Sequence, residues 1–148
     1  MKVTVYVDGS FNEERQTYGG GIVILNFPGQ DGALQIKTVG NKVNMLTHRN
    51  ISGEILAVCT AFKLCMGDAS IDEMDIYYDY AGIEYWATGK WQAKKPISQL
   101  YTGIVRQVTP RMKLHFHHVK AHSGDTYNTL ADKLAREATY MDATEGEA

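Results

Sequence analysis

The 148-residue sequence predicts an α/β fold, in which a mixed five-stranded sheet carries helices on both faces. Three strand-like segments come first and are joined by short connections, which is typical of antiparallel strands. Helices and strands then alternate to the end, and strand–helix–strand crossovers imply parallel pairing with helices packed on the sheet. The length suits one domain. A content of 44% hydrophobic and 22% charged residues excludes a disordered or collagen-like chain.

The three N-terminal strands are expected at residues 2–8, 19–25 and 34–39. In the first of them Val3, Val5 and Val7 alternate with more polar residues, which is typical of a strand buried on one face. The connections between the strands contain Asn, Pro and Gly, the residues that favour turns.

The remaining elements alternate between helix and strand. Apolar residues recur at helical spacing from Ile51 to Cys65, and Gly67 is expected to end that helix. The elements expected after it are a strand at 74–79, a short helix at 82–88, a helix at 96–108, a strand at 112–119 and a helix from 125 or 126 to 140. The acidic tail, residues 142–148, is expected to be disordered, which leaves residues 1–141 as the domain.

The cysteines and the hydropathy pattern predict a cytoplasmic protein. Cys59 and Cys65 lie six residues apart in a predicted helix, about 9 Å along its axis, which is too far for a disulfide. The sequence has no apolar run of the roughly 20 residues that span a bilayer, and no signal-peptide pattern at Met1.

Charge is distributed unevenly along the chain. Residues 85–124 contain seven Lys and Arg residues and no Asp or Glu, although the formal net charge of the whole chain is −2. Such a basic block is either a solvated surface or a binding surface for a polyanion such as nucleic acid.

Four acidic residues stand at the ends or beginnings of four different elements. Asp8 and Asp79 each end a predicted strand, while Glu54 and Asp132 lie early in predicted helices. Taken singly, each has an ordinary explanation: a turn-forming Asp at a strand end, a Glu at a helix start with Asn50 as its cap, and an ion pair of Asp132 with a residue four positions later. Taken together, four carboxylates that meet in the fold would hold a pair of hard divalent ions, Mg²⁺ or Mn²⁺, of the kind that cleaves phosphodiesters.

Several histidines and a glycine run invite other interpretations. His122 lies in a loop of small residues before the last helix, where an imidazole would move protons near neutral pH. His115, His117 and His118 lack the short-spaced Cys and His pairs of a structural zinc site and are expected on the sheet surface. The glycines at 19–21 precede a strand instead of a helix, so either a bulge or a close backbone approach is expected there, and not a phosphate loop.

Five short motifs, in this order and at these spacings, resemble the type 1 ribonuclease H family over residues 2–140. They are Val7-Asp8-Gly9-Ser10, Asn50 with Gly53-Glu54, Tyr78-Asp79, the segment 119–124, and Asn128 with the segment 131–135. The resemblance implies that Asp8, Glu54, Asp79 and Asp132 bind two Mg²⁺ ions, for which Mn²⁺ may substitute, and that His122 assists proton transfer or product release. It also implies cleavage of the RNA strand of an RNA–DNA hybrid, leaving a 5′-phosphate and a 3′-hydroxyl.

Substrate contacts follow from the same resemblance. Gly9, Ser10 and Asn50 are expected to contact the minor groove of the hybrid, where the 2′-hydroxyl marks RNA. Some members carry a long lysine-rich protrusion, and here only a reduced version exists, with Trp86, Lys90, Trp91, Lys94 and Lys95. These residues are expected either to contact the DNA strand or, for the tryptophans, to cover the core. After Asp79 the chain departs from the hydroxyl and amide residues that many members carry.

The sequence leaves three functions to be compared. The first is a metal-dependent hybrid endoribonuclease, the second a nuclease of the same fold that acts on structured DNA, and the third a hybrid-binding module that does not cleave. The chain is expected to act as a monomer, away from membranes, and without a small-molecule cofactor.

Overall fold

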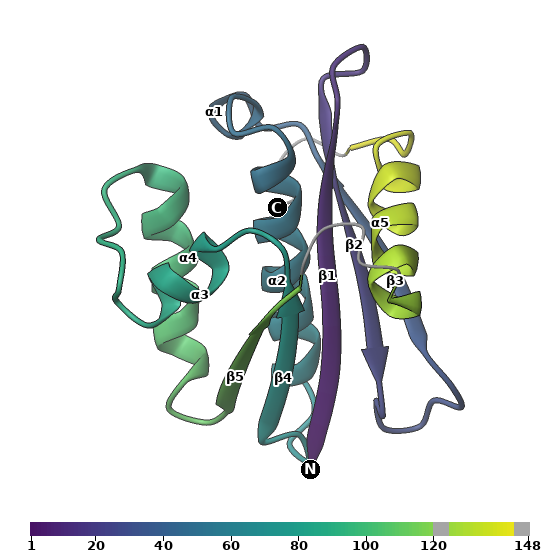
Figure 1. Ribbon diagram of the computed structural model, residues 1–148, viewed down its shortest axis with the longest axis vertical. Helices are drawn as coiled ribbons and strands as arrows, with labels where there is room; N and C mark the ends of the chain where they lie inside the picture. The colour runs from purple at the N-terminus through teal and green to yellow at the C-terminus, as the bar shows by residue number, and fades with distance from the viewer. Residues whose placement is uncertain (120–124, 144–148) are drawn as a thin grey trace.

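The computed structural model describes residues 1–119 and 125–143 and contains one five-stranded sheet in the order β3-β2-β1-β4-β5 (Figure 1). The strands are β1 (Lys2–Asn12), β2 (Thr17–Leu25), β3 (Leu34–Gly40), β4 (Glu73–Tyr78) and β5 (Lys113–His118). The helices are α1 (Val43–Leu46), α2 (Asn50–Met66), α3 (Gly82–Ala87), α4 (Pro96–Val108) and α5 (Thr126–Ala138). Pairing is antiparallel among β1, β2 and β3, and parallel from β1 to β4 and from β4 to β5, which confirms the predicted fold class.

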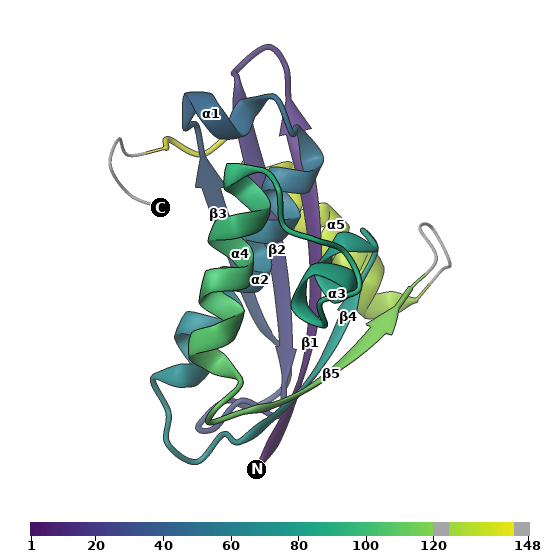
Figure 2. The ribbon, with the colours of Figure 1, turned by 90° about the vertical axis from the view of Figure 1, so that its left-hand side faces the viewer.

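The sheet lies between two helical layers. Helix α2 packs on one face with α4 lying over it, and α5 packs on the other face (Figure 2). The predicted close approach at residues 19–21 is confirmed on both faces: a Cβ on Gly20 would lie 2.8 Å from the Gly53 carbonyl oxygen of α2, and one on Gly21 would lie 2.0 Å from the Ala131 carbonyl oxygen of α5. Small residues thus let both helices contact the sheet backbone directly.

Two differences from the sequence-based expectations concern the elements around the first helix. Strand β1 does not end at Asp8 but continues to Asn12, because its pairing with β2 runs on through Gly9↔Gly20 to Asn12↔Thr17. Tertiary pairing therefore overrides the weak strand preference of glycine. The four-residue helix α1 was not predicted, since it is too short to show a helical period.

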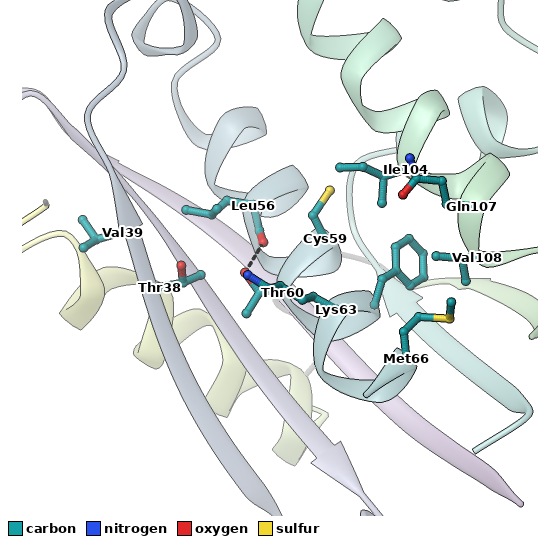
Figure 3. A pocket seen from close by; sticks show the side chains of 11 residues that line it. Thr38, Val39, Leu56, Cys59, Thr60, Lys63, Met66, Ile104, Gln107 and Val108 are labelled. Atoms are coloured by element: carbon teal, nitrogen blue, oxygen red, sulfur yellow. Dashed lines mark hydrogen bonds between the residues drawn. The ribbon is translucent and has the colours of Figure 1, made fainter. Parts of the chain in front are cut away.

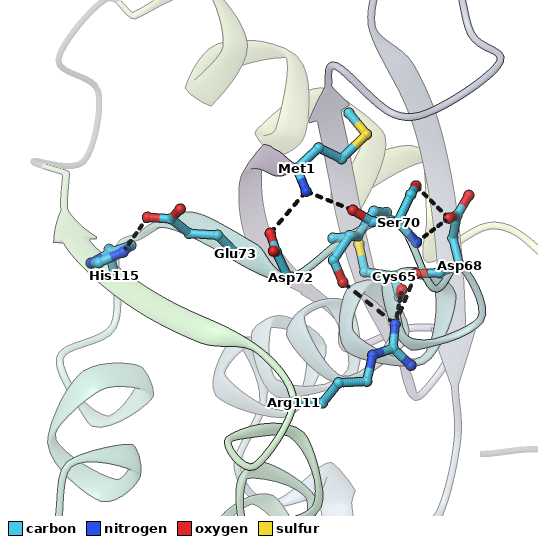
Figure 4. Close-up of polar contacts among 9 residues, drawn as sticks. Met1, Cys65, Asp68, Ser70, Asp72, Glu73, Arg111 and His115 are labelled. Carbon is cyan, nitrogen blue, oxygen red and sulfur yellow. Dashed lines mark hydrogen bonds and ion pairs between the residues drawn. The ribbon is translucent and has the colours of Figure 1, made fainter.

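The start of β1 and the turn after α2 are held by two sets of exposed hydrogen bonds from charged groups (Figure 4). The Arg111 guanidinium donates to the carbonyl oxygens of Met66 and Asp68, at 2.5 and 2.8 Å, and so ties the turn after α2 to the start of β5. The Met1 ammonium donates to the Ser70 carbonyl oxygen at 2.6 Å and pairs with Asp72 at 2.8 Å. Part of the basic block therefore has a structural role.

Two further expectations can be compared with the described residues. Cys59 and Cys65 are free thiols, as their spacing predicted. Among the helices of the described segments, none has the length and apolar character that crossing a bilayer requires. Most of the acidic tail, residues 144–148, lies outside the described residues.

Candidate active site

A small polar pocket of about 210 Å³ opens where β1 and β4 diverge. The residues that line it are Asp8, Gly9, Asn50, Asp79, Asn128, Thr129 and Asp132. The last pair of the β1–β4 ladder is Tyr6↔Tyr77, and Asp8 and Asp79 each lie two residues beyond it. Because strand side chains alternate between faces, both aspartates continue the face on which Tyr6 and Tyr77 stack, which is the face covered by α5. Helix α5, which packs on this face, contributes Asp132 to the pocket.

Glu54 does not line this pocket but contacts the backbone of Asp79, which does, and it is not a helix-capping residue. Its side chain is buried, and its carboxylate accepts hydrogen bonds from the backbone N–H groups of Asp79, at 3.1 Å, and of Tyr80, at 2.9 Å. The interpretation of Glu54 as a helix-start glutamate is therefore wrong, as is that of Asn50 as the cap. Arg49 occupies the cap position of α2, and no side chain forms a capping hydrogen bond there.

Gly9 allows α2 to come this close to β1. A Cβ on Gly9 would lie 2.1 Å from the Asn50 carbonyl oxygen and 2.3 Å from the Glu54 nitrogen. The glycine after Asp8 is thus required by packing, and it places the first turns of α2 beside the acidic pocket.

Burial and mutual repulsion shift the ionisation of two of the acids. Burial, with repulsion from Asp132 and Asp79, raises the pKa of Asp8 to about 7, although the Gly9 N–H donates to its carboxylate at 2.8 Å. Burial, with repulsion from Asp8 and Asp79, raises the pKa of Glu54 to about 8. Carboxylates that are hard to ionise in one place are typical of a site that needs a cation or a proton to compensate them.

The donor set of the pocket fits a hard divalent cation by its chemistry. Its described side chains offer carboxylate, amide and hydroxyl oxygens, without imidazole or thiolate among them, and oxygen ligands are what Mg²⁺ and Mn²⁺ prefer. In the described ranges, however, no three Asp, Glu, His or Cys side chains are already arranged around a single point to hold an ion.

Helix α5 places Asp132 by its own capping. The Asp125 carboxylate accepts from the N–H groups of Tyr127 and Asn128, at 2.9 and 3.0 Å, and so fixes where the helix begins. Asp132 lies one turn beyond Asn128 on the same face. The ordinary explanation of Asp132, an ion pair with Arg136, is present at 3.1 Å, and the same residue also lines the pocket.

The pocket brings together five of the predicted site residues, namely Asp8, Gly9, Asn50, Asp79 and Asp132, and Glu54 is hydrogen-bonded to the backbone of Asp79 beside it. Ser10 lies further along β1 and does not line the pocket. His122 lies outside the described residues. Asn128 and Thr129 line the pocket but were not predicted as site residues. For Asn128 a signal existed, because it precedes Asp132 by four positions in an amphipathic helix.

The tryptophan and lysine segment forms an aromatic cluster next to Asp79. The Trp86 and Trp91 rings lie 5.8 Å apart, and Tyr80 lies 5.6 Å from Trp86. Trp86 is half-buried against the main core, as the core-cover alternative has it, whereas Trp91 is 39% exposed. Three exposed lysines flank the cluster: Lys90, Lys94 and Lys95. Lys90 Nζ lies 4.4 Å from the centre of the Tyr85 ring.

Two other places have no comparable chemistry. A larger cavity of about 510 Å³ lies between α2, α4 and β3, lined mainly by apolar side chains such as Leu56, Ile104 and Val108, and no carboxylate lines it (Figure 3). His115 and His117 lie on the sheet surface as predicted, where they pair with Glu73 at 2.7 Å and Asp75 at 3.0 Å.

A mixed five-stranded sheet with this strand order, and an acidic pocket where its central strands diverge, defines the class of ribonuclease H-like hydrolases. The RNase H family model matches residues 1–140, and the chain belongs to that family. The resemblance inferred from the five motifs is thereby confirmed, and the protein is a hydrolase of the ribonuclease H type.

Named relatives and solved structures agree with this assignment. The chain is 32% identical to a ribonuclease H of Ehrlichia ruminantium, with 91% of this chain and 92% of the relative covered. It is 30% identical to a ribonuclease H of Chromohalobacter salexigens, with 93% and 84% covered. In fold it is similar to RNase H1 from Halobacterium salinarum, with a TM-score of 0.72, 21% identity and 93% and 97% of the two chains covered. It is equally similar to LC11-RNase H1 in complex with an RNA/DNA hybrid, with a TM-score of 0.72, 21% identity and 93% and 96% covered.

Proposed function

We propose that the protein hydrolyses the RNA strand of RNA–DNA hybrids with the help of two divalent ions, leaving a 5′-phosphate and a 3′-hydroxyl. The observation that carries the proposal is the pocket lined by Asp8, Asp79 and Asp132. Among the described residues no Lys or Arg lines it, and the basic group that contacts these acids is Arg136, which pairs with Asp132 at 3.1 Å. The hybrid bound to the structurally similar LC11-RNase H1 supports the choice of substrate.

Asp8, Glu54, Asp79 and Asp132 would hold the ions, Mg²⁺ or in its place Mn²⁺. Bound there, such ions activate a water molecule and stabilise the leaving oxygen of a phosphodiester. Glu54 also orients the backbone after β4 through the N–H groups of Asp79 and Tyr80, and so fixes the direction of the Asp79 side chain. We assign to His122 a role in proton transfer or product release.

Two parts of the surface are assigned to the substrate. Gly9 and Asn50 line the pocket and can contact a nucleic-acid strand that is bound over it. Ser10 follows Gly9 on β1. The exposed Trp91, with Trp86 below it, offers a ring to a sugar of the DNA strand, and Lys90, Lys94 and Lys95 offer charges to its phosphates. With only three lysines there, we expect a shallow salt dependence of binding, because each phosphate contact contributes about 0.9 to its slope.

One experiment tests the cleavage. The protein is incubated with Mg²⁺ and with end-labelled RNA–DNA hybrid, duplex DNA, duplex RNA or a four-way DNA junction. We expect cleavage confined to the RNA strand of the hybrid. Cleavage of the junction would identify a nuclease for structured DNA, and hybrid binding without cleavage would identify a binding module, and either outcome contradicts the proposal.

The remaining expectations are part of the same proposal. We propose that the protein acts as a monomer in the cytoplasm, without a small-molecule cofactor, and the free thiols Cys59 and Cys65 support a reducing compartment. We also retain residues 1–141 as the catalytic domain. Light scattering tests the monomer, and a chain shortened after Met141 that loses activity would contradict the domain boundary.

A further inference from the structure

An exposed arginine contacts one of the acids of the pocket. Arg136 lies one turn after Asp132 on α5, and its Nη2 is 3.1 Å from Asp132 Oδ2. The Arg136 side chain is 64% exposed and that of Asp132 30% exposed, so the pair lies at the rim of the pocket. Among the described residues, Asp132 is the only one of the four acids with an ion-pair partner.

We infer that Arg136 is a positioning residue that sets the affinity of the site for divalent ions, an inference that rests on the proposed function. In the absence of an ion, the guanidinium compensates the charge of Asp132 and occupies one of its oxygens. An incoming cation must therefore share Asp132 with a positive charge that is already there. Arg136 thus lowers the affinity for the ion and stabilises the ion-free site.

The alternative is an ordinary surface ion pair between residues four apart on a helix. Such a pair contributes little to stability and is screened by salt. It would leave ion binding unchanged when it is removed. The two interpretations therefore differ in a quantity that can be measured without any catalytic assay.

The test is calorimetric titration of the full chain with Mn²⁺, in the absence of nucleic acid. Removing a unit charge a few ångströms from a dication at a solvated rim favours binding, so we expect Arg136→Gln to lower the Kd for Mn²⁺ roughly three- to tenfold. Arg136→Lys keeps the charge and should stay within about twofold of the unaltered chain. Arg106→Gln is the matched control, because Arg106 is also exposed but lies on α4, on the other side of the sheet.

The outcomes separate this inference from the proposed function. An unchanged or increased Kd for Arg136→Gln, while the unaltered chain binds Mn²⁺, overturns the role of Arg136 alone. If Arg106→Gln lowers the Kd by the same factor, the effect comes from the net charge of the chain and not from the contact with Asp132. That result also overturns the role of Arg136. If the unaltered chain binds no Mn²⁺, the two-ion proposal fails and the role of Arg136 fails with it. Thermal unfolding with and without Mn²⁺ shows independently whether each variant is folded and whether the ion stabilises it.

Discussion

The carboxylate of Glu54, on the second turn of α2, accepts a hydrogen bond from the backbone N–H of Tyr80 at 2.9 Å. The adjacent N–H of Asp79 donates to the other carboxylate oxygen. One side chain thus joins the helix on one face of the sheet to the segment that follows strand β4. The position of the Asp79 side chain in the pocket depends on this junction.

Removing the Glu54 carboxylate should destabilise the fold as well as the site. Glu54→Ala leaves two partly buried N–H groups without this partner, so we expect the free energy of unfolding to fall by about 1–3 kcal/mol. Glu54→Gln keeps one acceptor oxygen and should cost less. Urea unfolding in the presence of EDTA measures both, and equal losses for Ala and Gln would contradict the role of the hydrogen bonds.

The ion-free protein should become less stable as the pH rises. The pKa of Asp8 is raised to about 7 and that of Glu54 to about 8, whereas in the unfolded chain both lie near 4. Groups whose pKa is raised by folding stabilise the protein fully below the unfolded pKa, and this contribution is lost as the pH rises through the folded pKa. We expect Tm in EDTA to fall by about 4–8 °C between pH 5 and pH 8, equivalent to about 2 kcal/mol.

Divalent ions should weaken or reverse this trend, because they bind the ionised carboxylates and compete with protons. The comparison is a pair of melting curves at pH 8, with EDTA and with Mg²⁺. A Tm in EDTA that is constant or rises from pH 5 to pH 8 would falsify the assignment of raised pKa values.

Asp8→Asn should separate activity from stability. We expect turnover of the hybrid to fall by about 100-fold or more, since an amide is a poor substitute for a carboxylate ligand. At pH 8 in EDTA the same variant should melt about 2–4 °C higher, because an uncompensated charge is gone. At pH 5, where Asp8 is protonated, the difference in Tm between the variant and the unaltered chain should vanish. A lower Tm of Asp8→Asn at both pH values would contradict the repulsion between Asp8 and the neighbouring carboxylates.

Alanine substitutions at two glycines, one in a crowded and one in an open environment, should have opposite effects on stability. A Cβ on Gly21 would lie 2.0 Å from the Ala131 carbonyl oxygen, so Gly21→Ala must displace α5 and Asp132 with it. We expect a loss of more than about 2 kcal/mol and of most activity. Gly103, within α4, has no atom within 4 Å of an added Cβ, and Gly103→Ala should stabilise the protein by about 0.5–1 kcal/mol. Thermal unfolding and hybrid cleavage of the two variants decide the point.

Arg111 should matter for stability and not for catalysis. Its guanidinium donates to backbone carbonyl oxygens at the end of α2, and Arg111→Met removes these charged hydrogen bonds, so we expect a loss of about 1–3 kcal/mol. Arg106→Met removes another exposed arginine, on α4, and should change stability by less than about 0.5 kcal/mol. Equal effects in urea unfolding, or a fall in kcat at a temperature where both variants are folded, would argue against a purely structural role.

The sequence alone predicted the features that depend on local patterns. Helix α4 has the bounds expected from the sequence, and α2, whose apolar residues recur at helical spacing, ends before Gly67 as predicted. The strand–helix alternation predicted the mixed sheet, because crossover connections impose parallel pairing. The types of residue needed for a hard divalent ion, Asp8 and Asp79 among them, were also visible without coordinates.

Tertiary structure decided how those residues are used. The length of β1 depends on its pairing with β2, the partners of Glu54 come from a segment 25 residues away, and Asn128 enters the pocket only through the packing of α5 on the sheet. Local propensity covers the backbone within a few residues, whereas these features arise from contacts between distant segments. Periodicity specifies which face of an element is buried, and only the packed sheet specifies which acids become neighbours and which of them, like Asp132, acquires a cation as a partner.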